Sequence, residues 1–390
     1  MGQQKLYFKK FYKNKGNWIP ILVFIVAILL VLIMNTRVAD ERNMAGMVQA
    51  EISMNEEMLA LNGQRNESAE TAEEKAAFKE GEELSRARIN TQKRMVELYN
   101  NEKWAEAYRI NIHLTKESFG LYDGETPASP ELRESISRDI AIYTKLAELD
   151  IKSDQVDMET QGATFLYRTL ANFFPVLFVI ILCFTLNAVF TDRFYGHLDR
   201  SLLLPQKYIV GTVQRLLFGL LLAVVLYIVT CLIAYLSASA FSGSGSFAYP
   251  IAIDTRTGVK TESVGSLLVQ TVALQLLAII VVVLMIDLVS KLCKRMMSTL
   301  FISLLVVVAP VLVVGKIVPL DRWAHLLPGT YFNAVSVVDN SLAIISDNGS
   351  ISFINGVIVL IVMTTILLIL NFGMDGWRSK GVTLNIAKQA

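Results

Sequence analysis

The chain has 390 residues, 53% of them hydrophobic, and a formal net charge of +1 at pH 7. Its mean hydropathy of +0.46 is high for a soluble domain of this length, which indicates a membrane protein. The near-zero net charge gives no bulk field that would attract nucleic acid, so no nucleic-acid partner is expected. The three cysteines lie in or beside apolar runs, so we expect no disulfide framework.

Residues 1–17 mix lysines with aromatic side chains, in the stretch QKLYFKKFYKNKGNW. One interpretation is a short amphipathic helix on the cytoplasmic membrane surface, with Phe8, Phe11 and Tyr12 on one side and membrane lipid as its partner. The alternative is a basic flank that only sets the membrane topology.

Six long apolar runs predict six transmembrane helices, since each approaches or exceeds the roughly 20 residues that cross a bilayer. The runs cover residues 18–34, 168–190, 209–236, 265–289, 297–315 and 353–373. We expect the first helix, 18–36, to be retained, because its core is long for a signal peptide and NTRVAD is a poor cleavage site. The fold class predicted is an all-α integral membrane protein, with helices two to six within 166–373 and a tail at 374–390.

Residues 37–165 are polar and predict a large helical insert between spans one and two. Apolar residues recur there at steps of three and four, which is typical of amphipathic helices packed on a core. The four series are Met47, Ala50, Met54, Met58, Leu61; Leu84, Ala87, Thr91, Met95, Leu98; Trp104, Tyr108, Ile112, Thr115; and Leu132, Ile136, Ile140, Tyr143. Thr71 with Glu74 predicts a capping box, and Ser129 before Pro130 predicts an N-cap. Gly63 and the stretch GLYDGETPASP predict breaks, and GSGSFAY at 243–249 predicts an exposed loop.

Basic residues in short loops predict the orientation of the spans. They gather in residues 5–15, 193–207, 291–295 and 378–388, whereas the opposite short loops hold only Arg256, Lys260, Lys316 and Arg322. Both termini and the segment 191–208 are therefore expected in the cytoplasm, and 37–165 is expected outside the cell.

Several motifs of energy-converting proteins are absent from the sequence. It contains no G-x-x-x-x-G-K, no H-E-x-x-H and no G-x-S-x-G, so we expect neither an enzyme nor a cofactor bound by this chain. The central parts of the apolar runs lack charged residues, which argues against an ion or proton relay. Asp287, one helical turn from Lys291, predicts an interfacial ion pair of little energy. Gln270 and Gln275 predict hydrogen bonds to a neighbouring helix rather than a lined path.

The segment TDRFYGHLDRSLLLPQKY, residues 191–208, lies between the second and third runs. We predict a short helix that seats in a cleft of another protein. Phe194, Tyr195 and Leu198 would supply apolar contact. Four charged residues would orient the helix, namely Asp192, Arg193, Asp199 and Arg200. From the residues alone, an ordinary interfacial loop is an equal alternative.

This segment resembles the coupling region of type-2 ATP-binding-cassette permeases. Members of that family carry an acidic residue, a glycine about four positions on, leucines, and a Leu-Pro followed by a basic residue. Their counterparts here are Asp192, Gly196, Leu204, Pro205 and Lys207. The segment HLLPGTYF resembles the family's Leu-Pro-aromatic stretch, with Leu327, Pro328, Tyr331 and Phe332 as counterparts. The resemblance implies two membrane halves, identical or homologous, and a cytoplasmic ATP-binding-cassette ATPase that holds ATP and Mg²⁺.

We therefore expect the membrane subunit of an ATP-driven exporter in a bacterial plasma membrane. An apolar path suits a hydrophobic or amphipathic cargo, such as a peptide, an antimicrobial or a lipid-like molecule. Two alternatives stay open: a multi-span sensor or adaptor whose external helices bind a ligand or partner, and a membrane enzyme with an unrecognised site. Pro175 and Pro310 predict kinks, either for a lateral path or for packing.

Overall fold

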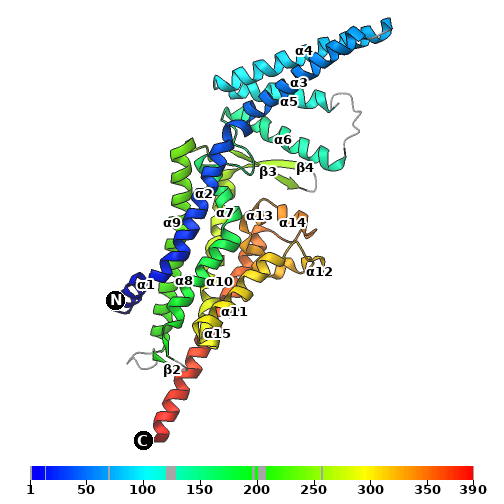
Figure 1. Ribbon diagram of the computed structural model, residues 1–390. Coiled ribbons are helices and arrows are strands. Elements are labelled where there is room, and N and C mark those ends of the chain that lie inside the picture. Colours follow the sequence, from blue (N-terminus) through cyan, green and yellow to red (C-terminus); the bar gives the residue numbers. More distant parts are fainter. Residues whose placement is uncertain are drawn as a thin grey trace. The chain divides into compact units, whose positions relative to one another are not determined.

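The computed structural model describes residues 2–13, 15–68, 71–119, 129–195, 198–200, 208–255 and 258–389. It is mostly helical (Figure 1). Within these residues, six helical segments are long and apolar enough to cross a membrane, which agrees with the six predicted spans and fits a multi-pass membrane protein. They are Lys15–Ala39, Phe174–Thr191, Ile209–Ser242, Val264–Cys293, Met296–Val313 and Phe353–Trp377.

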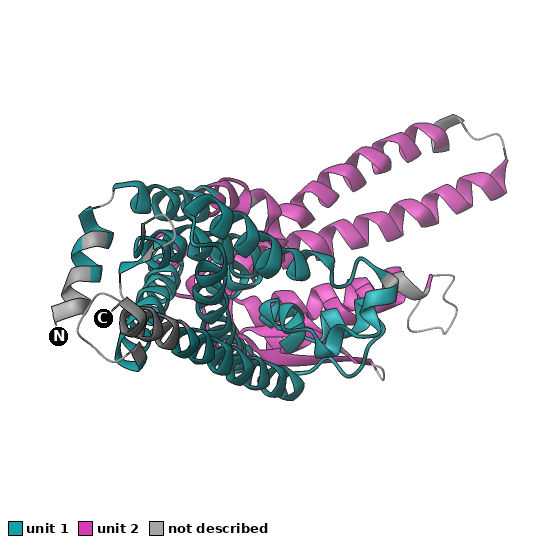
Figure 2. Ribbon diagram, turned by 90° about the horizontal axis from the view of Figure 1, so that it is seen from below, with its two compact units in different colours: residues 1–30, 166–237, 266–390 teal, residues 31–165, 238–265 magenta. Residues whose placement is uncertain are grey.

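The chain forms two compact units, coloured separately in Figure 2. Unit 1 comprises Met1–Leu30, Leu166–Ser237 and Ser266–Ala390, and unit 2 comprises Val31–Phe165 and Ala238–Gly265. Unit 2 thus contains the whole segment 37–165 together with residues 238–265. Four helices have residues in both units: α2 (Trp18–Arg42), α7 (Gly162–Asn172), α9 (Tyr208–Ser242) and α10 (Val264–Cys293).

The remaining elements of unit 1 are helices and one short hairpin. They are α1 (Gly2–Lys13), η1 (Lys15–Asn17), a π-helical turn (Phe174–Phe178), α8 (Val179–Thr191), β1 (Phe194–Tyr195), β2 (Leu198–Asp199), α11 (Met296–Val313), α12 (Val318–Asp321), η4 (Ala324–Leu326), η5 (Pro328–Phe332), α13 (Ala334–Val338), α14 (Ser341–Ile345) and α15 (Phe353–Gln389). The π-turn contains Pro175, whose missing N–H accounts for the interrupted α-helical ladder there.

Polar side chains within the spans find partners on neighbouring helices. The Gln275 amide on α10 donates to the carbonyl oxygen of Leu170 at 3.2 Å, and the Tyr227 hydroxyl on α9 donates to Gln275 Oε1 at 2.7 Å. The Asn187 amide on α8 donates to the carbonyl oxygen of Met296 at 3.0 Å. The prediction of an interhelical hydrogen bond is confirmed for Gln275.

The segment with the Leu-Pro-aromatic sequence packs tightly on α11. Tyr331 is fully buried, and its hydroxyl donates to the carbonyl oxygen of His325 at 2.7 Å. A Cβ atom on Gly329 would lie 2.7 Å from Cβ of Pro310, so only glycine allows this approach. The helix α11 continues through Pro310.

Gly356 and Gly373 on α15 give a matched pair of substitutions. A Cβ on Gly356 would lie 2.6 Å from the ring of buried Tyr331, whereas a Cβ on Gly373 meets nothing within 4 Å. Gly356→Ala is therefore expected to lower the stability of unit 1 by about 1–3 kcal/mol through overpacking. Gly373→Ala should leave stability unchanged or raise it, since alanine favours a helix. Unfolding curves of the two purified variants test this, and equal effects would contradict the packing.

Unit 2 consists of packed helices and a β-hairpin. Its further elements are α3 (Met44–Ser68), α4 (Ala72–Asn100), α5 (Trp104–Ser118), α6 (Pro130–Leu149), β3 (Pro250–Thr255) and β4 (Gly258–Ser263). The helices α3 and α4 form a long hairpin, visible at the top of Figure 1. The capping box of Thr71 with Glu74 and the N-cap of Ser129 are confirmed. A loop is present at 243–249, but it is not exposed throughout, because Tyr249 is buried and its hydroxyl donates to the carbonyl oxygen of Asp154 at 3.0 Å. Most of GLYDGETPASP lies outside the described residues.

Two expectations for the helices of unit 2 need correction. Gly63 does not break a helix but lies inside α3, where the neighbouring helix formers outweigh one glycine. The series Met47, Met54, Met58 and Leu61 is exposed, and Met44, Val48 and Ile52 form the buried face instead. The helix α3 has two apolar stripes, so periodicity alone did not select the buried one.

The four described strands were not expected in an all-α fold. β3 and β4 pair antiparallel, with Ile251 opposite Glu262 and Ile253 opposite Lys260. β4 alternates exposed and half-buried residues, which is the pattern of a strand with one covered face, whereas β3 begins with four apolar residues. Each of the two strands is only six residues long, so their pattern did not outweigh the helical pattern of the surrounding sequence.

Candidate functional site

A buried network of charged side chains connects the end of α8 with α9, α10 and α15. Its members lie in unit 1 and come from four stretches far apart in sequence. The charged members are Arg193, Asp199, Arg215, Asp287, Lys291 and Asp375. Asp287 and Lys291 are fully buried, and Arg215 is 3% exposed. Such groups are costly to bury unless they are paired, so their partners determine what the site can do.

Arg215 holds three helices together. Its Nε lies 2.7 Å from Oδ1 of Asp287 on α10, and one Nη lies 3.2 Å from Oδ2 of the same carboxylate. The same Nη lies 2.9 Å from Oδ2 of Asp375 on α15. The Thr212 hydroxyl also donates to that oxygen at 2.6 Å. The planar guanidinium suits this two-pronged contact with a carboxylate.

Lys291 completes the connection between α10 and α15. Its Nζ lies 3.0 Å from Oδ2 of Asp287 and 2.8 Å from Oδ2 of Asp375. It also donates to Oδ1 of Asn371 at 2.8 Å and to the carbonyl oxygen of Asn371 at 3.0 Å. The Asn371 amide in turn donates to the carbonyl oxygen of Leu284 at 3.1 Å. All three donor positions of the ammonium therefore have nearby acceptors.

Arg193, two residues beyond α8, attaches the loop to this network by longer contacts. One Nη lies 3.8 Å from Oδ1 of Asp287 and 3.5 Å from the Ser290 hydroxyl, and Nε lies 3.7 Å from Oδ2 of Asp199. Its guanidinium carbon lies 4.5 Å from the centre of the Phe194 ring, a cation–π geometry. Among the described atoms, its Nε and Nη1 have no hydrogen-bond acceptor. Burial lowers the pKa of Arg193, as does the nearby Arg215, while Asp287 and Asp199 oppose them.

The charges of the network balance, because three cations meet three carboxylates. The predicted ion pair of Asp287 with Lys291 is present at 3.0 Å, but both side chains are buried, so the expectation of a weak interfacial contact is wrong. Both side chains are withdrawn from water into a network in which losing one partner leaves a buried charge uncompensated. The contacts around Arg215 and Lys291 form a tight clamp of α9, α10 and α15, and Arg193 is a looser link to that clamp.

The structure also revises the predicted docking segment. Instead of a helix, β1 and β2 pair antiparallel, with Phe194 opposite Asp199 and Tyr195 opposite Leu198. Adjacent aromatic residues favour a strand, which explains the difference.

The charged residues of this segment divide between the interior and the surface. Arg193 and Asp199 have buried side chains that point into the chain's own network, so they are not available to orient a partner. Asp192 and Arg200 are exposed. The side chains of Tyr195 and Leu198 lie outside the described part of the chain, as do Gly196 and Pro205.

The network residues other than Arg193 and Asp199 were missed as a site in the sequence. Each lies near the end of an apolar run, where a charge ordinarily faces water. The signal available was their combination: Arg215, Asp287 with Lys291, and Asp375 all fall at the ends of runs predicted on one side of the membrane. Matched opposite charges at a common depth predict helix-to-helix pairing.

Comparisons with known proteins give no family for this chain. No protein-family model matches it, and neither the curated proteins nor the solved structures yield a match.

Proposed function

We propose that the chain is the membrane subunit of an ATP-driven exporter, moved by a separate cytoplasmic ATPase that binds the segment 191–208 and holds ATP and Mg²⁺. The observation that carries this proposal is the attachment of that segment to the buried network through Arg193. A displacement of the 191–208 loop would be transmitted to α9, α10 and α15 through these side-chain contacts. A protein without its own phosphate-binding motif needs such a link to be driven from outside.

The two parts of the network suit different tasks. The clamp around Arg215 has contacts of 2.7–3.2 Å to Asp287 and Asp375 and keeps three helices moving together. The contacts of Arg193 at 3.5–3.8 Å permit the loop to shift without dismantling the clamp. Closure of the ATPase would then bias the membrane helices between two packings. The balanced charges and the position near the helix ends favour this mechanical role over an ion relay.

Exposed apolar side chains suit a hydrophobic or amphipathic cargo, such as a peptide, an antimicrobial or a lipid-like molecule. Leu217, Leu221, Leu232 and Leu236 on α9 are each about half exposed within this chain. Such faces fit lipid, cargo or a second membrane half, identical or homologous. The excess of basic residues in the short segments supports cytoplasmic termini and an external 37–165. The membrane in this proposal is the bacterial plasma membrane.

Co-purification tests the partner. We expect an ATPase with a G-x-x-x-x-G-K-[ST] motif to purify with the tagged chain from native membranes in stoichiometric amount. The double variant Tyr195→Ala/Leu198→Ser should lose it, since a few buried apolar contacts dominate a protein interface. Phe194 is left intact because its ring supports Arg193.

The control variant removes comparable apolar side chains elsewhere in unit 1. Ile344→Ala/Ile345→Ser changes two exposed residues of α14 and should retain the ATPase. Retention of the ATPase by the loop variant would refute the docking assignment. A stable partner that lacks a nucleotide-binding motif would refute the proposed function itself.

One observation favours a second function, that of a sensor or adaptor whose helical domain binds a ligand. Unit 2 has a cavity of about 360 Å³, a size typical of ligand sites, lined by Met44, Met47, Met95, Arg88 and Tyr143 among others. Methionine surfaces adapt to varied apolar ligands. Burial raises the pKa of Tyr143 to about 12, so its hydroxyl stays protonated as a hydrogen-bond donor. Purification with a non-ATPase partner would favour this second function.

A further inference from the structure

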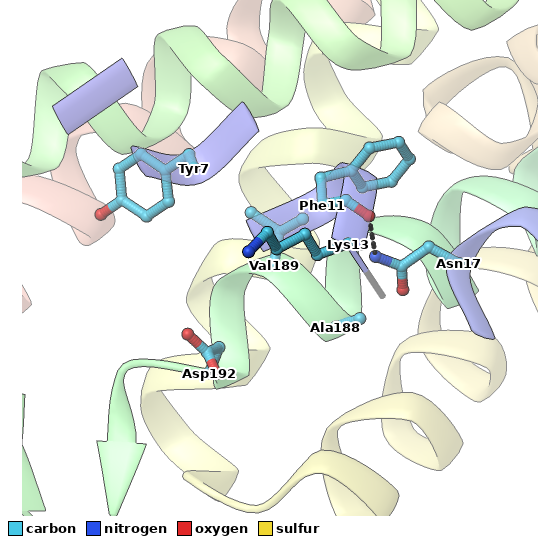
Figure 3. Close-up of a pocket in the computed structure, with 7 residues that line it drawn as sticks. All are labelled: Tyr7, Phe11, Lys13, Asn17, Ala188, Val189 and Asp192. Carbon is cyan, nitrogen blue, oxygen red and sulfur yellow. Dashed lines mark hydrogen bonds between the residues drawn. The ribbon is translucent and has the colours of Figure 1, made fainter. Parts of the chain in front are cut away.

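A cavity of about 350 Å³ lies beside α1 and the end of α8, within unit 1. Figure 3 shows its lining, which comes from α1, η1 and the last turn of α8. Part of the lining is well packed, because Phe11 is buried and packs with Ile21 and Phe218. The Asn17 amide donates to the carbonyl oxygen of Phe11 at 3.2 Å, which satisfies one of the last carbonyls of α1. The cavity therefore belongs to the packed structure of this unit.

The lining carries opposite charges beside an apolar floor. Lys13 at the end of α1 and Asp192 at the end of α8 both line the cavity, as does the ring of Tyr7. In Figure 3 the Lys13 nitrogen and the Asp192 carboxylate lie on the same side of the lining residues, whereas the Tyr7 hydroxyl points away from Lys13. Val189 and Phe11 supply apolar surface. The site thus offers a cation, a carboxylate and a hydroxyl beside an apolar surface.

The position of the cavity along the chain places it at the end of two spans. Lys13 precedes the span that begins at Lys15, and Asp192 follows the span that ends at Thr191. The neighbouring aromatic side chains Phe8 and Tyr12 are 62% and 64% exposed. Exposed aromatic rings next to lysines are typical of the headgroup level of a bilayer.

We propose that this cavity binds the headgroup of a phospholipid that carries both a phosphate and a primary ammonium, as phosphatidylethanolamine does. The Lys13 ammonium faces the phosphate, and the Asp192 carboxylate accepts from the lipid ammonium. Val189 and Phe11 contact the first carbons of the acyl chains. The volume is at the lower end of ligand sites, which suits a headgroup rather than a whole lipid.

The Asp192 carboxylate disfavours the binding of other lipid headgroups. Asp192 would repel a headgroup with only negative charge, such as phosphatidylglycerol, and would repel free phosphate. A choline headgroup balances the charges but has no N–H to donate to Asp192. The proposal shares one residue, Asp192, with the segment 191–208 that is proposed to bind the ATPase. Its test uses the purified chain without the ATPase, so that the two proposals can fail separately.

Native mass spectrometry of the full chain tests the site. The detergent-purified protein is offered equal amounts of phosphatidylethanolamine, phosphatidylglycerol and phosphatidylcholine with matched acyl chains. We expect the ethanolamine lipid to dominate the bound population. Lys13→Gln and Asp192→Asn should each weaken its binding by about tenfold, as expected for loss of one charge-assisted hydrogen bond.

Matched controls separate this site from general surface charge. Lys15→Gln and Asp347→Asn remove exposed charges outside the described lining and should leave lipid binding unchanged. Stronger binding of phosphatidylglycerol, or equal losses for Lys13→Gln and Lys15→Gln, would overturn the proposal. Displacement of the lipid by an equal concentration of soluble phosphoethanolamine would also overturn it, because it would assign the site to a free metabolite.

Discussion

Replacing Asp287 by asparagine is expected to lower the free energy of unfolding of unit 1 by about 3–5 kcal/mol. Asp287 is fully buried and faces three cations, with Arg215 and Lys291 in direct contact at 2.7 and 3.0 Å. Without its charge, the network keeps all three cations but only two carboxylates. Removing one partner of a buried ion pair leaves the remaining charge desolvated, and this penalty exceeds that of an exposed pair.

The measurement follows unit 1 alone. Of the four tryptophans, Trp18, Trp323 and Trp377 lie in unit 1 and Trp104 lies in unit 2. In a Trp104→Phe background, fluorescence during denaturant unfolding therefore reports unit 1. Separate reporting matters because two units need not unfold in one transition.

Two further variants sharpen the result. Asp347→Asn removes an exposed acid and should change stability by less than about 0.5 kcal/mol. The double variant Asp287→Asn/Lys291→Met restores the charge balance and should recover part of the loss, giving a favourable coupling between the two sites. Equal effects for Asp287→Asn and Asp347→Asn would show that the network is solvated, which contradicts its burial.

The second large effect is expected on coupling. Arg193→Gln should leave the ATPase bound to the loop but abolish the nucleotide-dependent movement of α10. Glutamine is too short and uncharged to maintain the contacts of Arg193 with Asp287 and Asp199. The cost in stability should be smaller than for Asp287→Asn, since the Arg193 contacts are long and Arg215 still neutralises Asp287.

Cys293 at the end of α10 gives a native reporter for this prediction. It is half-buried and follows Lys291 by two residues, whereas Cys183 is fully buried. The rate of maleimide labelling at Cys293, measured on its peptide by mass spectrometry, depends on access to the thiol. In the wild-type complex we expect ATP with vanadate to change this rate several-fold, and in Arg193→Gln we expect no change. Loss of the ATPase from Arg193→Gln would instead place Arg193 in the docking contact.

The sequence predicted the spans well because their signal is local. A run such as 265–289 needs only its own composition to indicate a membrane helix, and the structure has a helix at Val264–Cys293. The caps at Thr71 and Ser129 were likewise predictable, since each involves side chains within three residues.

The network could not be read in this way because its pairs are distant in sequence. Arg215 and Asp287 are separated by 72 residues, and Arg215 and Asp375 by 160. Only the packing of the helices brings them together. The face of α3 that is buried was unpredictable for a similar reason: Met54 and Ile52 are both apolar, and the contact with α4 selects Ile52.

The proposed exporter depends on one claim. This chain has no energy source of its own for transport, and an ATPase moves it through the 191–208 loop. The labelling rate of Cys293 in proteoliposomes tests that claim most directly, with the chain alone and with its ATPase. We predict that ATP changes the rate only when the ATPase is present and the loop is intact. A change with ATP in the purified chain alone, or an unchanged rate in the active complex, would contradict the account.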